Sequence, residues 1–373
     1  MLAGCVPGPR EGRKASGSAL QLERLRASTE RITAITVCTR PFRPQGPRLD
    51  VEQVSGKTVV HNYGHGGSGW SLSWGSSAIA VEKALASGER RIAVIGCGAL
   101  GLTSALLLQR AGAQVTIYTK ELPPAVPSAR ATGLWTPDSR ICFEEHATLE
   151  FKQLWQQMAR RSFATYQGFL GLPGTPVEYI DFYLVSDSPG APHRVAPIAA
   201  SRPKFAELQH ELIGDLMLQT QEFAPGEHPL GAHYLRGSPL MMFNLTSYIR
   251  TLMADFRAAG GQIQIEEFQE PADLARIHEK TLINATGYGA RALFDDRTLV
   301  PVRGQLARAV PQPRIDYGLL YRDSVFVPRR DGFVFQVIGD SDYYGFDDER
   351  TLADRAEAEH AVDTIGALFA PVS

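Results

Sequence analysis

The chain has 373 residues, of which 44% are hydrophobic and 21% are charged, and its formal net charge is -2. This length allows one large or two moderate domains, each with a sizeable core. The small negative charge excludes the basic excess that a general nucleic-acid or membrane-surface partner would require. The sequence has no run of about 18 apolar residues, so we expect no membrane-spanning helix.

The four cysteines, Cys5, Cys38, Cys97 and Cys142, are widely separated and form no CxxC pair. We therefore expect neither a metal site nor a disulfide framework. Residues 1–30 are basic, small and aperiodic, which predicts a flexible leader. Its opening, MLAGC, is similar to the end of a bacterial lipoprotein signal with Cys5 at the lipidation position, but the preceding apolar run is missing. We expect a cytoplasmic protein, with an exported lipoprotein as the alternative.

The first elements form a recognisable order. Residues 31–40 predict a strand, and a proline-rich loop leads from it to a short strand over 57–64. After the glycine-rich run HNYGHGGSGWSLSWG, apolar spacing predicts a helix over 76–86 that ends at Ser87-Gly88. The pattern then predicts a strand over residues 91–96, a helix over 100–111 and a second strand over 114–120. This βαβ unit predicts an α/β class with a nucleotide-binding sheet.

The second half of the chain is less regular. Residues 149–170 predict a helix, and short strands, turns and prolines follow up to residue 239. Another helix is predicted over 245–259, and TLINATG at 281–287 indicates a buried parallel strand of the nucleotide sheet. Strands recur over 300–339, and an amphipathic helix over 352–369 completes the chain.

The spacing GxGxxG at Gly96, Gly98 and Gly101 predicts a nucleotide site. The first glycine permits a tight turn, the second lets the backbone approach a pyrophosphate, and the third lets the helix pack on the strand. The acidic residue that usually binds the ribose is absent from the end of the next strand, where Lys120 and then Glu121 stand. This motif alone leaves NAD, NADP and FAD open.

The glycine-rich run ahead of that motif favours a flavin. Four glycines lie between His61 and Trp70, and they allow the backbone to approach a flat ring closely. Ser68 and Ser71 add hydroxyl groups near the start of the following helix. We interpret His61 and His65 as packing or hydrogen-bonding residues rather than as catalytic bases.

The stretch VVHNYGHGGSGWSLSWGSS resembles the signature near the C-terminus of D-amino-acid oxidases, an FAD-dependent family. Five further stretches are similar to other segments of that family: RPFRP, ATGLWTP, INATGYGARAL, VRGQLARA and LYRDSVFVP. The order differs, because residues 31–86 precede the GxGxxG strand here and are joined to it by the bridge SGERR. The resemblance therefore implies a circularly permuted oxidase fold, with an FAD-binding Rossmann-type domain and an interleaved substrate-binding domain of mixed sheet.

This fold implies four parts of the chain. A leader occupies residues 1–30, and a strand with its proline loop at residues 31–59 contributes to the substrate site. The FAD-binding domain comprises residues 60–145 and 240–305. The substrate-binding domain comprises residues 146–239 and 306–373.

The resemblance also implies roles for single residues. Arg43 would bind the substrate carboxylate, Tyr321 would be the lid tyrosine, and the carbonyl of Gly67 would accept a hydrogen bond from the substrate amine. Val325 stands where the family has a second tyrosine. Thr136 and Asp138 stand at the pocket wall, which implies a more polar pocket. The residues implied to contact FAD are Gly66, Ser68, Gly69, Trp70, Ser71, Gly96, Cys97, Gly98, Ala99, Leu100, Gly101, Ser128, Ala131, Thr132, Gly133, Leu134 and Phe268.

The implied reaction is the oxidative deamination of a D-amino acid by hydride transfer to flavin N5. Its products would be a 2-oxo acid, ammonia and, where oxygen is the electron acceptor, hydrogen peroxide. Another acceptor stays open, as does a homodimer. Two alternatives remain: a glycine- or sarcosine-type amine oxidase on the same fold, and a protein that binds FAD without turnover.

Overall fold

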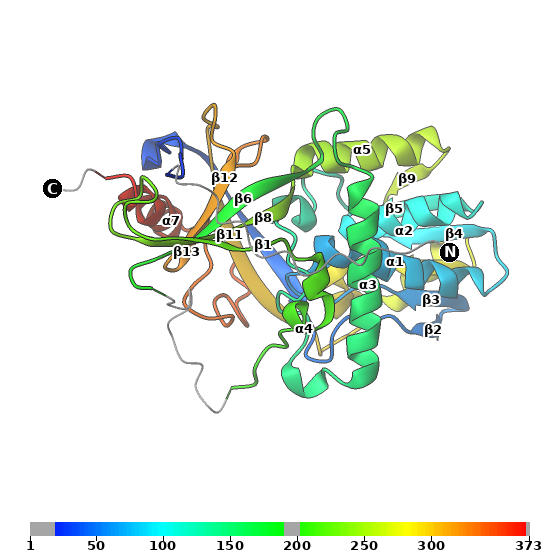
Figure 1. Ribbon diagram of the computed structural model, residues 1–373. Helices are drawn as coiled ribbons and strands as arrows, with labels where there is room; N and C mark the ends of the chain where they lie inside the picture. Colours follow the sequence, from blue (N-terminus) through cyan, green and yellow to red (C-terminus); the bar gives the residue numbers. More distant parts are fainter. Residues whose placement is uncertain (1–18, 190–201, 371–373) are drawn as a thin grey trace, which may run out of the picture.

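Two β-sheets organise the computed structural model, which describes residues 19–189 and 202–370. Figure 1 shows the two sheets at opposite ends of the molecule. One has six strands in the order β2-β3-β10-β4-β5-β9, and the other has eight in the order β1-β11-β14-β13-β12-β6-β8-β7. The fold is therefore of the mixed α/β class that the sequence predicts.

The six-stranded sheet is parallel except for its edge strand β2 (Val51–Val54), which runs antiparallel to β3 (Lys57–His61). The strand β10 (Thr281–Asn284) lies between β3 and β4 (Arg91–Ile95) and is parallel to both. Beyond β4 follow β5 (Gln114–Thr119) and β9 (Gln262–Ile265). The predicted return of residues 281–287 to the nucleotide sheet is confirmed.

Helices cover one face of this sheet. They are α1 (Gly69–Leu85), α2 (Ala99–Arg110) and α5 (Leu245–Ala258), with α3 (Leu149–Gln167) packed on α1. Alternate strand residues such as Val60, Val94 and Ile283 are buried beneath them, and their neighbours Val59 and Ala93 are buried on the other face. Strands buried on both faces explain the unbroken apolar runs in the sequence.

The eight-stranded sheet joins segments from the whole chain. Its strands are β1 (Ile32–Phe42), β6 (Val177–Ser186), β7 (Gln221–Phe223), β8 (Tyr234–Phe243), β11 (Val300–Ala309), β12 (Tyr317–Tyr321), β13 (Ser324–Val327) and β14 (Phe333–Val337). The last helix, α7 (Arg355–Ala367), packs on one face of this sheet. The short helices α4 (Gln209–Ile213) and α6 (Ala290–Leu293) lie in connections.

The beginning and the end of the described chain lie together. Arg24 Nη2 donates a hydrogen bond to the Phe369 carbonyl at 2.7 Å, and Leu25 is buried in the cluster that contains Leu368. Residues 19–30 are thus packed against the region of α7, whereas the sequence predicts a flexible leader there. The rest of that leader, with Cys5, lies outside the described residues.

Three boundaries differ from the sequence prediction. Helix α1 begins at Gly69 rather than at residue 76, because Trp70, Leu72 and Trp74 are buried in the core and extend the helix into the glycine-rich run. Residues 51–54 and 57–59, which the domain prediction groups with the substrate site, belong to the six-stranded sheet. Strand β11 already belongs to the eight-stranded sheet from Val300.

Candidate functional site

The turn between β4 and α2 has the geometry that a pyrophosphate loop requires. Gly96 has φ of 107°, and a Cβ there would lie 2.5 Å from the Ala285 carbonyl oxygen. A Cβ at Gly101 would lie 1.9 Å from the Gly96 carbonyl oxygen, so only glycine lets helix and strand pack this closely. Gly98 stays partly exposed and faces Ser128, whose hydroxyl is 3.0 Å from its ideal Cβ position.

The second glycine turn, Gly66–Gly69, joins the two sheets. Gly66 N donates to the Pro41 carbonyl of β1 at 2.8 Å, and Gly67 N donates to the Ser139 carbonyl at 2.9 Å. A Cβ at Gly66 would meet the Arg140 carbonyl oxygen at 1.9 Å. Gly67 and Gly69 remain partly exposed between buried neighbours, which leaves their backbone accessible to a ligand.

The two glycine turns lie beside each other, because Ser128 connects them. Trp70 Nε1 donates to the Ser128 carbonyl at 2.8 Å, and Ala99 N donates to the Ser128 hydroxyl at 3.1 Å. The N-termini of α1 and α2 therefore face one region, where their positive dipole ends favour an anion such as a diphosphate. Residues 31–86 thus fold back onto the GxGxxG loop.

The segment Ala131–Trp135 forms a further wall. It runs antiparallel to β8, with Phe243 N donating to the Gly133 carbonyl at 2.7 Å and Trp135 N donating to the Met241 carbonyl at 2.9 Å. Thr136 N donates to Ser71 Oγ at 2.8 Å and so ties this wall to α1. Within residues 19–189 and 202–370, the backbone N–H groups of residues 131–134 have no acceptor.

These observations fit FAD. Buried backbone donors without partners are rare in native proteins, and a bound polar ligand supplies the missing acceptors. Of the four backbone donors at residues 131–134 without an acceptor in the described chain, that of Gly133 belongs to a buried residue and the other three to partly exposed residues. They lie beside two helix N-termini and two partly exposed glycine turns. Phe268, the predicted adenine contact, lies beyond β9 and packs edge-on against Tyr118 at the end of β5, with ring centroids 6.0 Å apart.

The two histidines of the glycine-rich run are buried. His65 Nε2 is 2.7 Å from Ser76 Oγ, its Nδ1 has no partner, and burial lowers the pKa of His65 to about 3. Burial and the charge of Arg48 also lower the pKa of His61, which contacts Glu52 and Asn284. Both rings are therefore neutral near neutral pH, in agreement with a structural role.

Arg43 is engaged within the protein. Its Nε lies 3.3 Å from Asp296 Oδ2 and donates to Thr298 Oγ1 at 2.9 Å, while its Nη1 donates to the Gly46 carbonyl at 3.1 Å. These contacts direct the guanidinium to the loop after α6. Two of its three guanidinium nitrogens, Nε and Nη1, are thus engaged within the protein, and the carboxylate role that the resemblance implies for Arg43 stays a prediction.

Arg40, three residues earlier in RPFRP, occupies a different position. It lies on β1 opposite Val302, and its guanidinium fills the space above Gly304, where a Cβ would be 2.5 Å from Arg40 Nη2. Its Nη1 donates a hydrogen bond to the Arg303 carbonyl at 3.3 Å, and no carboxylate of the described residues pairs with it. The sequence interpretation missed Arg40; the two-residue periodicity of a strand was the available signal.

Tyr321 lies on the opposite face of the eight-stranded sheet from Arg40. It belongs to the cluster packed against α7, and its hydroxyl donates to Asp187 Oδ1 at 3.0 Å. Only Arg322 and Asp323 separate β12 from β13, so the expected lid is a tight turn. Val325 faces the other way, in an apolar cluster against which Leu134 packs.

The predicted polar wall is only partly present. Asp138 accepts the N–H groups of Leu208 and Gln209 at 3.1 and 3.0 Å, so it caps the start of α4 instead of facing a ligand. Burial raises the pKa of this carboxyl above its ordinary value. The wall near Leu134 is apolar, and its other members are Ile180, Met242, Leu306, Leu320, Val325, Val327 and Val334.

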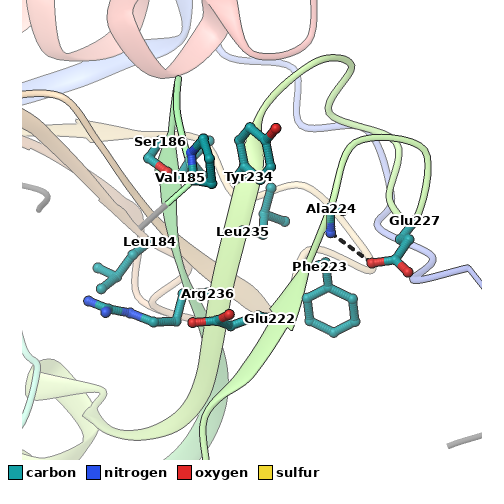
Figure 2. A pocket seen from close by; sticks show the side chains of 11 residues that line it. Leu184, Val185, Ser186, Glu222, Phe223, Ala224, Glu227, Tyr234, Leu235 and Arg236 are labelled. Carbon is teal, nitrogen blue, oxygen red and sulfur yellow. Dashed lines mark hydrogen bonds between the residues drawn. The ribbon is translucent and has the colours of Figure 1, made fainter. Parts of the chain in front are cut away.

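A separate cleft of about 320 Å³ lies at the far edge of the eight-stranded sheet from β1, around β6, β7 and β8. Figure 2 shows its lining, with Glu222 beside Arg236 and with Ala224 N bonded to Glu227. It contains none of the residues predicted to bind FAD or substrate. In the described part of the chain, no group of three His, Cys, Asp or Glu residues could hold a metal ion, and no helix is long and apolar enough to cross a bilayer.

Comparison with known proteins identifies the family. The DAO family, described as FAD dependent oxidoreductase, matches residues 91–372. The chain belongs to this family. As a member it is FAD-dependent, and the predicted cofactor is confirmed. The matched region begins at β4 and leaves out β1–β3 and α1, the segment that the sequence indicates is displaced.

Similar proteins carry related names. The D-amino-acid oxidase of Streptomyces coelicolor is 27% identical over 242 residues, which are 63% of this chain and 64% of that protein. The D-amino acid oxidase of Dugesia ryukyuensis is 26% identical over 65% of this chain and 68% of its own length. The match spans less than two thirds of the first of these relatives. Among solved structures, iminodiacetate oxidase from Chelativorans sp. BNC1 has a TM-score of 0.48 at 14% identity, covering 74% of this chain and 79% of that one.

Proposed function

We propose that this FAD-dependent oxidoreductase oxidises D-amino acids with uncharged side chains to 2-oxo acids and ammonia. The observation that carries the proposal is the link between Arg40 and the glycine turn. The Pro41 carbonyl accepts a hydrogen bond from Gly66 N at 2.8 Å. Arg40 precedes Pro41 in the chain and Gly67 follows Gly66, so this hydrogen bond brings Arg40 and Gly67 into the same region. We infer that the Arg40 cation and the carbonyl of the partly exposed Gly67 bind the carboxylate and the amine of one amino acid.

Arg40 takes the carboxylate role in this proposal, in place of Arg43. A guanidinium binds a carboxylate through two parallel hydrogen bonds, and Arg40 has no internal carboxylate to neutralise it within the described chain. The Gly67 carbonyl would accept a hydrogen bond from the amine. Together these contacts would fix the orientation of the substrate Cα–H, which is the protein's main contribution to such a reaction.

The bound flavin would supply the redox chemistry, as acceptor of two electrons from the substrate carbon. The protein would supply orientation and a surface poor in water, since Leu134, Leu306 and Val325 lie on the sheet face that carries Arg40. This apolar surface favours alkyl or aromatic side chains over carboxylates, because a second charge would be desolvated without a partner there. The sequence-based expectation of a polar pocket is replaced by this one.

An anaerobic titration tests the function. We expect the flavin absorbance to be bleached by D-amino acids with apolar side chains and unchanged by the L-enantiomers. Bleaching by L-forms alone would refute the stereochemical proposal. Preferential bleaching by glycine or sarcosine would establish the amine-oxidase alternative, and FAD binding without any bleaching would establish the non-catalytic one. Peroxide formation in air would identify oxygen as the acceptor.

We also infer that the chain is a circular permutant of the oxidase fold. Three observations support this inference: the family match begins only at residue 91, β3 and α1 complete the nucleotide sheet from the N-terminal side, and Arg24 contacts Phe369. Contact between the first and last described segments is what joining and reopening a chain requires.

A further inference from the structure

An ion pair between the fully buried Arg329 and the partly buried Asp331 lies behind the wall segment Ala131–Leu134. Arg329 follows β13 and has no exposed side-chain surface, and its Nε and Nη2 contact the two carboxylate oxygens of Asp331. Its remaining nitrogen, Nη1, donates to the Ala131 carbonyl at 2.7 Å. The Arg329 guanidinium, which follows β13 of the eight-stranded sheet, thus binds a backbone carbonyl in the loop that follows β5 of the six-stranded sheet.

Asp331 is held equally firmly. Its Oδ2 accepts Thr246 N at 3.0 Å and Thr246 Oγ1 at 2.6 Å, at the N-terminus of α5. Arg308 approaches the same carboxylate at 4.0 Å. Burial alone would raise the pKa of Asp331, but Arg329 and the Thr246 donors hold it at about 2. The pair therefore stays ionised, and it ties Ala131 to a rigid helix end.

The direction of one peptide plane follows from this contact. In a trans peptide the carbonyl and the next N–H point in opposite directions. Because Arg329 fixes the Ala131 carbonyl, the Thr132 N–H is directed away from Arg329. That N–H has no acceptor within the described chain. Gly133 supports the arrangement, since its φ is 93° and a Cβ there would lie 3.1 Å from Arg329 Cδ.

We propose that Arg329 is a positioning residue for the flavin, and that it acts by orienting the Ala131–Thr132 peptide so that the Thr132 N–H faces the cofactor. Without Arg329 this peptide can rotate and present the Ala131 carbonyl to the ring instead, which replaces a donor by an acceptor. This inference rests on the FAD contacts proposed for Ala131–Leu134. It assigns no chemical step to Arg329.

The test compares FAD affinity in three single variants, measured by titrating FAD into the apoprotein. Arg329→Met and Arg329→Lys should each raise the FAD Kd by about tenfold or more, since a charge-assisted hydrogen bond is lost. Lysine keeps the charge next to Asp331 but cannot bind Asp331 bidentately and Ala131 at once. Arg330→Met is the matched control: Arg330 is exposed and pairs with Glu178, and its loss should leave the Kd within about twofold.

The outcomes are distinguishable. A changed Kd together with a shifted visible flavin spectrum in both Arg329 variants supports positioning. A lower melting temperature of the Arg329 variants with parental Kd and spectrum would refute it, because the residue would then be structural only. If Arg329→Met does not fold, Arg329→Lys decides between these results. Failure of the parent protein to bind FAD would refute the proposed cofactor contacts instead.

Discussion

The two arginines of RPFRP should respond in opposite ways to replacement by leucine. Arg40 has a single weak internal bond, so Arg40→Leu removes little that stabilises the fold. It does remove the proposed partner of the substrate carboxylate. The loss of a charge-assisted hydrogen bond costs about 1.5–3 kcal/mol, which corresponds to an increase in KM of about 10- to 150-fold.

Arg43→Leu should instead destabilise the protein. It leaves Asp296, whose side chain is 7% exposed, without its cation. The cost is moderated because Asp296 still accepts bonds from Tyr63 and Thr298, and we expect about 1–3 kcal/mol. Melting temperatures and steady-state kinetics with one D-amino acid separate the two effects. Unchanged KM in Arg40→Leu together with a raised KM in folded Arg43→Leu would refute our assignment and restore Arg43.

Three further predictions concern the glycine turns, pH and chain order. Gly101→Ala should abolish FAD binding, because the added Cβ would lie 1.9 Å from the Gly96 carbonyl oxygen. The control Gly214→Ala should bind FAD normally, because open space surrounds that position. Equal FAD affinities of the two variants in a titration would contradict the packing argument. Burial lowers the pKa of His65 from 6.5 to about 3, so the stability that this neutral ring contributes is present above pH 6.5 and is lost as the pH falls. From about pH 7 to about pH 5 the parent should lose about 2 kcal/mol more unfolding free energy than His65→Gln, as measured in urea, and equal losses would show that His65 titrates normally. A chain opened within residues 87–90 and joined from residue 370 to residue 19 should fold and bind FAD, and an insoluble product that refolds without FAD uptake would count against the permutation.

The sequence predicts what depends on local sterics. Gly96, Gly98 and Gly101 specify their turn through the space that each backbone needs: the first two lie between β4 and α2, and Gly101 lies in the first turn of α2. The apolar run at residues 281–287 similarly identifies a parallel strand, because only burial on both faces tolerates it. These features require no knowledge of distant residues.

The sequence does not specify which face of a strand a side chain occupies, or which partner lies across the fold. Arg43 follows the last residue of β1, so strand periodicity cannot place it, and its partner Asp296 is far along the chain. Successive residues of a strand point to opposite faces of the sheet. Leu320 therefore lies on one face, and the ring of Tyr321 lies on the other face, which α7 covers. Asp138 is polar at a predicted wall position, but it caps a helix that begins 71 residues later.

The circular permutation that we infer would be compatible with function, because the proposed substrate contacts stay within one contiguous segment. Strand β1, the Gly66–Gly69 turn and α1 all lie between residues 32 and 85, and the hydrogen bond from Gly66 N to the Pro41 carbonyl is internal to that segment. The link from α1 to β4 carries no predicted FAD or substrate contact; it includes Gly88, whose ideal Cβ has no neighbour within 4 Å. A join at this link would perturb neither the Arg40 face nor the pyrophosphate loop. An opening between α7 and β1 would likewise leave both intact, since Arg24 and Phe369 pack the two ends together.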